Sequence, residues 1–304
     1  MKINRVEIIP VNIPYKMPFR VSTGAVTSGN YIIVKIQTDE GIEGIGSSIG
    51  APSVGNTRES IMAQIKSIAS GVLLGQDPLN TERILSRIDV VLPLNWRTKA
   101  HIDYALYDLK GKILNVPVYQ LLGGLTREKI PLEMIIMLDE PEVQAEMAAK
   151  YIEAGFHGLK MHVGGDFKMA VKRFKAVREA VGPDIPISID MSSVTGTPSH
   201  QNAHDALRLI EELVKYGINY AEQPVTTYDI DGFKAIKSRT KVPLAADASA
   251  ESVLDAYNII KQGAADIFHV LMGRLGGIRK ALQYTTLIEC ASLDYAICVL
   301  GNGI

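Results

Sequence analysis

The hydrophobic and polar positions follow two different patterns along the 304-residue chain. In the first part, β-branched residues cluster or alternate as they do in strands, over 6–11, 31–36 and 42–46. Apolar residues then recur at helical spacing, over 57–73, 79–92 and 97–114. This order, strands followed by helices, predicts an α+β domain over residues 1–125.

From residue 126 to residue 304 short apolar runs alternate with amphipathic segments. Strands are predicted over 131–137, 158–163, 186–190, 218–222, 243–247, 267–272 and 294–300. Helices are predicted between them, over 141–154, 167–181, 202–216, 229–238, 251–262 and 277–290. This alternation predicts parallel strands, either in a barrel or in a doubly wound sheet. A Gly-x-Gly-x-x-Gly motif does not follow any early strand, which argues against a dinucleotide site.

The composition is that of an ordinary soluble protein and narrows the range of partners. Hydrophobic residues make up 47% of the chain, charged residues 21%, and the formal net charge is -1. A net charge so close to zero gives no general attraction to nucleic acid or to an anionic membrane. Two cysteines form no disulfide framework, and the N-terminus has no signal-peptide pattern, so we expect a reduced cytoplasmic protein.

Three acidic residues each end a short β-type run in the second half of the chain. They are Asp190, Glu222 and Asp247. In consecutive strands of a (β/α) barrel, these carboxylates would meet at the C-terminal mouth, where barrel enzymes keep their chemistry. Converging carboxylates repel one another, and Mg²⁺ prefers oxygen ligands. The barrel interpretation therefore predicts a Mg²⁺ site formed by the three side chains.

Several motifs taken together resemble the mandelate racemase/muconate-lactonizing branch of the enolase superfamily. The motifs are Ala105-Leu-Tyr-Asp-Leu-Lys-Gly-Lys112, Pro117-Val-Tyr-Gln-Leu-Leu-Gly-Gly124, Gly158-Leu-Lys-Met-His162, Glu222-Gln-Pro224 and Gly276-Gly-Ile278, together with the three acidic strand ends. The resemblance implies an α+β capping domain over a modified (β/α)₇β barrel. It also implies Mg²⁺-assisted removal of a proton next to a carboxylate, with a Lys or His base.

The second barrel strand departs from the Lys-x-Lys pattern common in that family. It carries Lys160-Met161-His162, and strand alternation places Lys160 and His162 on one face. A neutral imidazole accepts a proton near pH 7, so His162 is the candidate base. Lys160 is then the candidate for electrostatic stabilisation of the developing negative charge. The alternative is that His162 is a packed remnant of a lost base.

The sixth barrel strand departs further, because Leu271 stands where the family often has an opposing lysine. His269, two residues earlier, is expected to pack in the barrel core. Arg274 is a candidate ligand for a substrate carboxylate, or else an exposed loop residue. Asp247-Ala-Ser249 replaces the more familiar Asp-Glu-Ser, which keeps the predicted ligand and removes a neighbouring acid.

These residues predict an enzyme that removes the α-proton of a small carboxylate substrate. With Leu271 opposite His162, one-base chemistry is favoured: β-elimination, as in a dehydratase, or cycloisomerisation. The alternatives are a degenerate, non-catalytic barrel, an epimerase or racemase with an unrecognised second base, and a barrel enzyme without metal. Arg20 and Thr23, in the polar segment 17–25, are candidate substrate contacts.

Seven predicted strands leave a TIM-type barrel one strand short at its C-terminal end. The missing strand would expose two sheet edges and part of the apolar lining. A homo-oligomer would cover part of that surface, and we expect one.

Overall fold

The computed structural model describes the chain except for residues 22–23, 51–55, 165, 192–201 and 300–304. The side chains of residues 17–21 and 24–26 also lie outside the description. Arg20 is therefore described only as part of a strand, and Thr23 not at all. The helices among the described residues include none that is long and apolar enough to cross a membrane.

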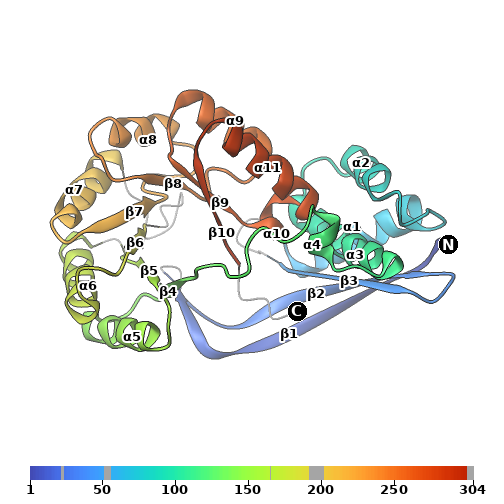
Figure 1. The fold of residues 1–304 in the computed structure, drawn as a ribbon, viewed down its shortest axis with the longest axis horizontal. Coiled ribbons are helices and arrows are strands. Elements are labelled where there is room, and N and C mark those ends of the chain that lie inside the picture. Colours follow the sequence, from blue (N-terminus) through green and yellow to red (C-terminus); the bar gives the residue numbers. More distant parts are fainter. Residues whose placement is uncertain (22–23, 51–55, 165, 192–201, 300–304) are drawn as a thin grey trace.

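The first part of the chain forms an antiparallel sheet covered by helices. Its strands are β1 (Ile3–Val21), β2 (Gly24–Thr38) and β3 (Glu43–Ile49), in that order across the sheet. The helices are α1 (Arg58–Ile68), η2 (Ala69–Leu73), α2 (Thr81–Val91), α3 (Trp96–Leu114) and α4 (Val118–Leu121). The β1–β2 hairpin is longer than the sequence pattern predicts, and it reaches across toward β4 (Figure 1).

Helix α3 packs directly against β3, and two glycines make the close approach possible. A Cβ atom at Gly44 would collide with the carbonyl oxygen of Ala105, and one at Gly46 with that of His101. Asp108 of the same helix accepts the backbone N–H of Ile45, at 2.7 Å. The apolar core of this domain lies between the sheet and helices α1, α2 and α3.

The second part forms a curved parallel sheet with helices on its outside (Figure 1). Its strands are β4 (Glu133–Ile136), β5 (Gly158–His162), β6 (Ile187–Asp190), β7 (Ile218–Glu222), β8 (Leu244–Ala246), β9 (Ile267–Val270) and β10 (Asp294–Ile297). Its helices are α5 (Pro141–Glu153), α6 (Phe167–Val181), α7 (Ala203–Val214), α8 (Ile230–Lys237), α9 (Val253–Gln262), α10 (Met272–Leu275) and α11 (Ile278–Cys290).

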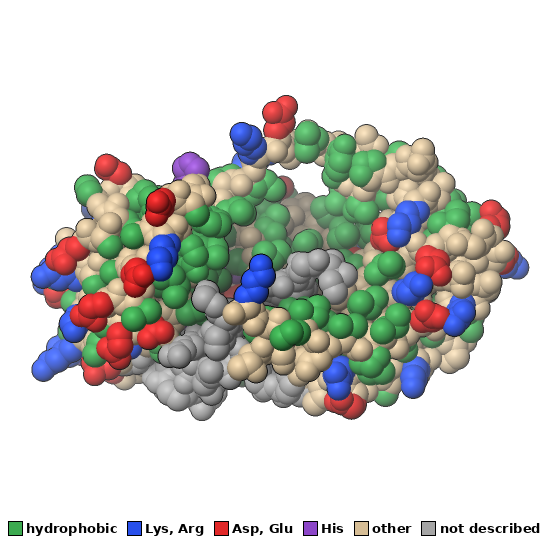
Figure 2. All heavy atoms as spheres, turned by 90° about the horizontal axis from the view of Figure 1, so that it is seen from below, with side chains coloured by type: hydrophobic (Ala, Val, Ile, Leu, Met, Phe, Trp, Pro, Cys, Tyr) green, Lys and Arg blue, Asp and Glu red, His purple; other side chains and the backbone are tan. Residues whose placement is uncertain are grey.

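The strand order is β10-β9-β8-β7-β6-β5-β4, so neighbours in the sequence are neighbours in the sheet. The predicted TIM-type barrel with an α+β cap is confirmed, while the domain boundary near residue 125 stays a prediction. Among the described residues, β4 and β10 are not paired with each other. Near these edges Leu132 and Ile297 are each 61% exposed. Hydrophobic side chains surround a hollow in the middle of one face (Figure 2).

The two sheets are tied together where α3 meets the start of α11. The carboxylate of Asp103 accepts the backbone N–H of Ile278 at 2.6 Å and that of Arg279 at 3.3 Å. Arg279 also forms an ion pair with Glu82 of α2, at 2.7 Å. These bonds hold the cap against the segment that follows β9, and so fix the cap over one side of the barrel mouth.

Candidate functional site

The strand pairing places three of the predicted site residues in one row. His162 of β5 is paired with Asp190 of β6, and Asp190 is paired with Glu222 of β7. Lys160 lies two residues before His162 and therefore faces the same side of the sheet. Asp247 directly follows β8. The C-terminal ends of four successive strands thus bring these five side chains to one region of the barrel.

Glu222 is the centre of this region and is 3% exposed. Its Oε2 atom lies 2.7 Å from Nζ of Lys160, and its Oε1 atom lies 2.9 Å from Nδ1 of His269. Burial raises the pKa of Glu222 and nearby Asp190 adds to the rise, while the two cationic neighbours oppose it. Burial lowers the pKa of Lys160, but Glu222 and Asp190 outweigh it, and the pKa lies well above its usual value.

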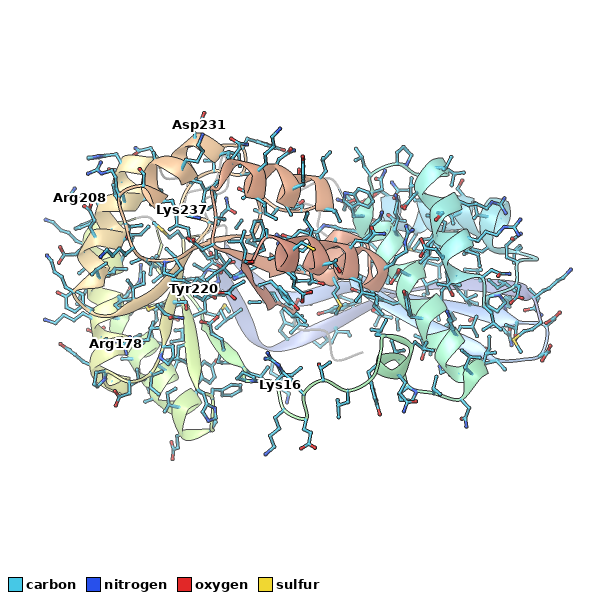
Figure 3. All side chains as sticks on the ribbon, turned by 45° about the horizontal axis from the view of Figure 1, so that its top comes forward. Lys16, Arg178, Arg208, Tyr220, Asp231 and Lys237 are labelled. Atoms are coloured by element: carbon cyan, nitrogen blue, oxygen red, sulfur yellow. The ribbon has the colours of Figure 1, made fainter. Side chains whose placement is uncertain are left out.

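The surroundings of His269 also shift the pKa of its imidazole. Burial lowers the pKa of its imidazole, but the carboxylate of Glu222 outweighs this effect and raises the pKa to about 10. Tyr220 packs edge-on against the imidazole, with ring centroids 5.9 Å apart. Figure 3 shows Tyr220 among the barrel strands, whereas Arg178 and Arg208 lie at the outer rim.

The remaining two carboxylates have basic neighbours of their own. Asp247 is paired with Nη1 of Arg274 at 2.9 Å, and Nε of Arg274 lies 3.2 Å from Glu251. Burial raises the pKa of Asp247, but the guanidinium outweighs burial, so the pKa lies below its usual value. Oδ2 of Asp190 lies 3.7 Å from Nδ1 of His162.

Gln223 joins the ends of β7 and β8 and so sets the spacing of the two ligand-bearing strands. Its backbone has a φ of 44°, an uncommon conformation for a residue other than glycine. The side-chain oxygen accepts the backbone N–H groups of Asp247 at 3.2 Å and Ser249 at 3.1 Å. The side-chain nitrogen donates to Oγ of Ser249 and to the carbonyl oxygen of Val225, both at 2.8 Å.

The donor atoms fit a divalent cation. Ligand atoms of Glu222, Asp247 and His269 all lie within 4.8 Å of one another. Two carboxylates and an imidazole are a common donor set for divalent metals. Asp190 lies outside this close group, although its charge acts on Glu222. Two of the three predicted carboxylates, Glu222 and Asp247, therefore lie together with a histidine that the sequence analysis assigned to packing.

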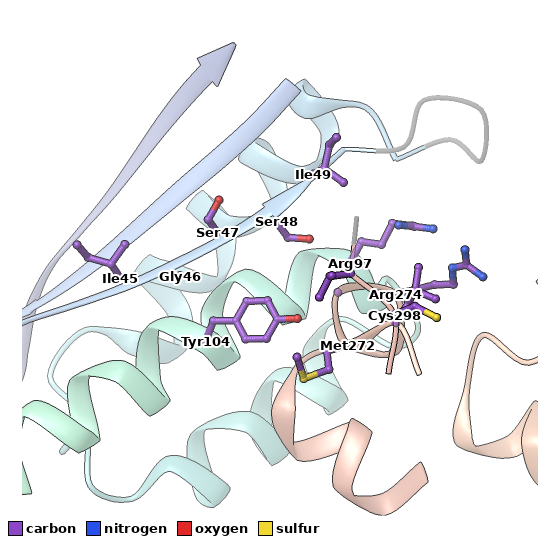
Figure 4. Close-up of a pocket in the computed structure, with 13 residues that line it drawn as sticks. Ile45, Gly46, Ser47, Ser48, Ile49, Arg97, Tyr104, Met272, Arg274 and Cys298 are labelled. Atoms are coloured by element: carbon purple, nitrogen blue, oxygen red, sulfur yellow. The ribbon is translucent and has the colours of Figure 1, made fainter. Parts of the chain in front are cut away.

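A cavity of about 300 Å³ lies between the cap and the barrel, and Arg274, the ion-pair partner of Asp247, is among the residues that line it (Figure 4). The cap contributes Ser48 of β3 and Tyr104 of α3, and the barrel contributes Leu271, Arg274 and Cys298. Leu271 thus lines the cavity at the end of β9, where the family resemblance led us to look for a second proton carrier. Arg274 borders the same cavity but is already paired with Asp247, so its binding of substrate stays a prediction.

In the described part of the chain, seven parallel strands lie under an α+β cap, and acidic residues close two successive strands, as in a capped barrel. The family model described as Enolase C-terminal domain-like matches residues 142–304. The model described as Mandelate racemase / muconate lactonizing enzyme, N-terminal domain, matches residues 3–123. The chain therefore belongs to the mandelate racemase/muconate lactonizing enzyme family of the enolase superfamily.

Individual relatives agree with this assignment. The chain is 37% identical to an N-succinyl-L-Arg/Lys racemase of Bacillus cereus over 99% of its own length and 80% of the relative's. It is 33% identical to a hydrophobic dipeptide epimerase of Enterococcus faecalis, over 99% and 82%. A chloromuconate cycloisomerase of Cupriavidus necator is 27% identical over 97% and 79%.

Solved structures of two of these relatives superpose closely on the chain. The structure of the Bacillus cereus racemase has a TM-score of 0.93 and 35% identity, covering 99% of this chain and 80% of its own. The structure of the Enterococcus faecalis epimerase, complexed with Mg and the dipeptide L-Leu-L-Tyr, has a TM-score of 0.91 and 32% identity, over 98% and 82%. The expectation of an enolase-superfamily enzyme is confirmed.

Proposed function

We propose that the chain removes the α-proton of a small carboxylate substrate with the help of Mg²⁺. The observation that carries this proposal is the meeting of Lys160, His162, Asp190, Glu222 and Asp247 at four successive strand ends. The carboxylates Asp190, Glu222 and Asp247 would hold the ion, as in the sequence-based prediction. When bound, Mg²⁺ supplies positive charge beside the substrate carboxylate and lowers the energy of the negative charge that forms there.

The two basic residues of β5 have different roles in this proposal. Lys160 is almost fully buried and contacts Glu222, and its pKa lies well above the usual value. A lysine held in its protonated form is a poor base, but it stabilises negative charge on the substrate. His162 is partly exposed beside Asp190, which orients a proton-accepting imidazole near the mouth. His162 is therefore the proposed base.

The residues that follow β9 favour one-base chemistry. Leu271 cannot carry a proton, and Arg274 is held by Asp247 and Glu251. Elimination or cycloisomerisation needs no second base on the opposite face. A second candidate is epimerisation, which the names of the racemase and dipeptide epimerase relatives favour. That reaction requires a proton donor on the face opposite His162.

The relatives also suggest a class of substrate. An N-succinyl amino acid and a dipeptide share a free carboxylate next to a carbon that bears an acylated nitrogen. We propose N-acyl amino acids, dipeptides included, as the first class to screen. Arg20 and Thr23 remain candidate contacts for the distal part of such a substrate. A homo-oligomer remains part of the proposal, because apolar side chains are exposed near β4 and β10.

The test is deuterium incorporation at the α-carbon in D₂O, followed by mass spectrometry and chiral analysis of N-acyl amino acids and dipeptides. We expect His162→Gln to reduce the exchange rate about 10²–10⁴-fold. His157→Gln, at an exposed histidine, is the matched control and should exchange at the wild-type rate. Exchange with loss of configuration supports an epimerase, and exchange with retention supports one-base chemistry. Full exchange in His162→Gln would refute the assigned base.

A further inference from the structure

His269 is a buried imidazole that faces two carboxylates across the barrel interior. It is 2% exposed, and its Nδ1 atom lies 2.9 Å from Glu222. Its neighbours on β9, Phe268 and Val270, belong to the apolar core between the sheet and the helices. Alternation along the strand therefore turns His269 into the barrel.

The surroundings of His269 satisfy its hydrogen-bonding groups only in part. Nδ1 is held by the charged contact with Oε1 of Glu222 at 2.9 Å, and Nε2 has no well-aligned hydrogen-bond partner among the described residues. Oε2 of Glu222 is buried with the ammonium of Lys160 at 2.7 Å, a charged contact that lacks hydrogen-bond alignment. Buried polar side chains normally have well-aligned partners, and a group whose partners are incomplete requires an explanation. A metal ion between the imidazole and the carboxylates would supply one.

We propose that His269 is itself a metal ligand, together with Glu222 and Asp247. This inference rests on the proposed function and extends that function by adding a nitrogen donor to the metal site. Two ligands of one ion, each at about 2.0–2.2 Å, lie at most about 4.4 Å apart. The three donor atoms lie within 4.8 Å of one another, so a shift of a few tenths of an ångström closes the group around an ion.

The nitrogen donor changes which ions the site prefers. Oxygen ligands suit Mg²⁺, whereas imidazole suits transition ions such as Fe²⁺, Ni²⁺ and Zn²⁺. A site built only from carboxylates discriminates less between Mg²⁺ and these ions. His269 therefore makes the site bind transition ions more tightly relative to Mg²⁺, and this selectivity depends on the imidazole.

The first test uses Mn²⁺ as a paramagnetic probe of the whole chain. Pulsed electron paramagnetic resonance detects nitrogen bound to Mn²⁺, and labelling with ¹⁵N-histidine identifies that nitrogen as imidazole. We expect the histidine coupling in the wild type and in His162→Gln. It should be lost in His269→Gln. Bound Mn²⁺ without histidine coupling, or coupling that disappears in His162→Gln, would overturn the proposal.

The second test compares affinities by calorimetry. The ratio of the Mg²⁺ to the Ni²⁺ dissociation constant should fall at least tenfold in His269→Gln, and His157→Gln should keep the wild-type ratio. An unchanged ratio in a folded His269→Gln variant contradicts the proposal. The outcomes separate this inference from the proposed function: oxygen-only Mn²⁺ binding with α-proton exchange refutes the role of His269 alone. Failure of the wild type to bind any divalent ion refutes both.

Discussion

Two buried histidines, one in the cap and one in the barrel, have opposite surroundings. His101 of α3 is 0% exposed, and its nitrogens lie 2.7 Å from the carbonyl oxygen of Arg97 and 3.3 Å from that of Ser48. Burial lowers its pKa to about 4, and backbone carbonyl oxygens only partly oppose the shift. His269 is equally buried, but a carboxylate raises its pKa to about 10. Burial alone therefore does not tell a structural histidine from a functional one.

The difference lies in what surrounds each ring. In the cap, backbone carbonyl oxygens contact the imidazole of His101, and the helix that carries His101 packs closely on Gly44 and Gly46. In the barrel, side chains of opposite charge meet one another at the strand ends. Charged groups gathered without complete hydrogen bonding are costly for folding, and such groups are typical of binding and catalytic sites.

The largest effect on the difference between cap and barrel is expected for Glu222→Gln, which removes the negative charge at the centre of the barrel site. We expect Mg²⁺ affinity to fall more than about 100-fold. Loss of a residue that only supports a metal ligand already lowers metal affinity about 10–100-fold. Lys160 and His269 would lose their shared carboxylate, so the metal-free chain should be less stable by about 3–5 kcal/mol. Calorimetry and urea unfolding measure the two effects.

The matched control is Glu146→Gln, because Glu146 pairs with Lys150 on the surface and both side chains are exposed. A surface ion pair of this kind contributes little. Wild-type Mg²⁺ affinity in Glu222→Gln would show that the barrel carboxylates are not a metal site.

The next prediction concerns pH and the cap. Between about pH 6.5 and pH 4 the unfolded His101 imidazole binds a proton, whereas the buried one, with a pKa of about 4, does not. The stability that His101 contributes is therefore present above pH 6.5 and is lost as the pH falls toward 4. From pH 7 to pH 4.5 the loss should be about 2–3 kcal/mol.

Urea unfolding at pH 7 and at pH 4.5, compared between the wild type and His101→Gln, measures this contribution. His101→Gln should lose less stability on acidification than the wild type by that amount, because glutamine does not titrate. His157→Gln, at an exposed site, should follow the wild type. Identical pH dependence of the wild type and His101→Gln would show that the cap histidine titrates as it does in the unfolded chain.

The sequence predicted the barrel well, because strands and helices there follow periodicities that depend on local residues. Asp190, Glu222 and Asp247 were proposed as ligands for the same reason, since each ends an apolar run, and their role as metal ligands stays a prediction. His269 was assigned to packing because it lies two residues before Leu271 and therefore deeper in the barrel. Its contact with Glu222 joins two separate strands, which no local sequence pattern predicts. The pairing of Arg274 with Asp247 joins helix α10 to the end of β8, so no local sequence pattern predicts it.

The smallest effect is expected for Tyr220→Phe, which separates the role of the Tyr220 hydroxyl from that of its ring beside His269. The Tyr220 hydroxyl donates a hydrogen bond to Oε2 of Glu133 at 2.7 Å. Glu133 is exposed, so water replaces the lost partner, and the cost in unfolding free energy should be about 1 kcal/mol. The ring that packs on His269 is retained, so metal affinity should change less than about twofold. A large loss of metal affinity would mean that this hydroxyl, and not the ring, positions the imidazole.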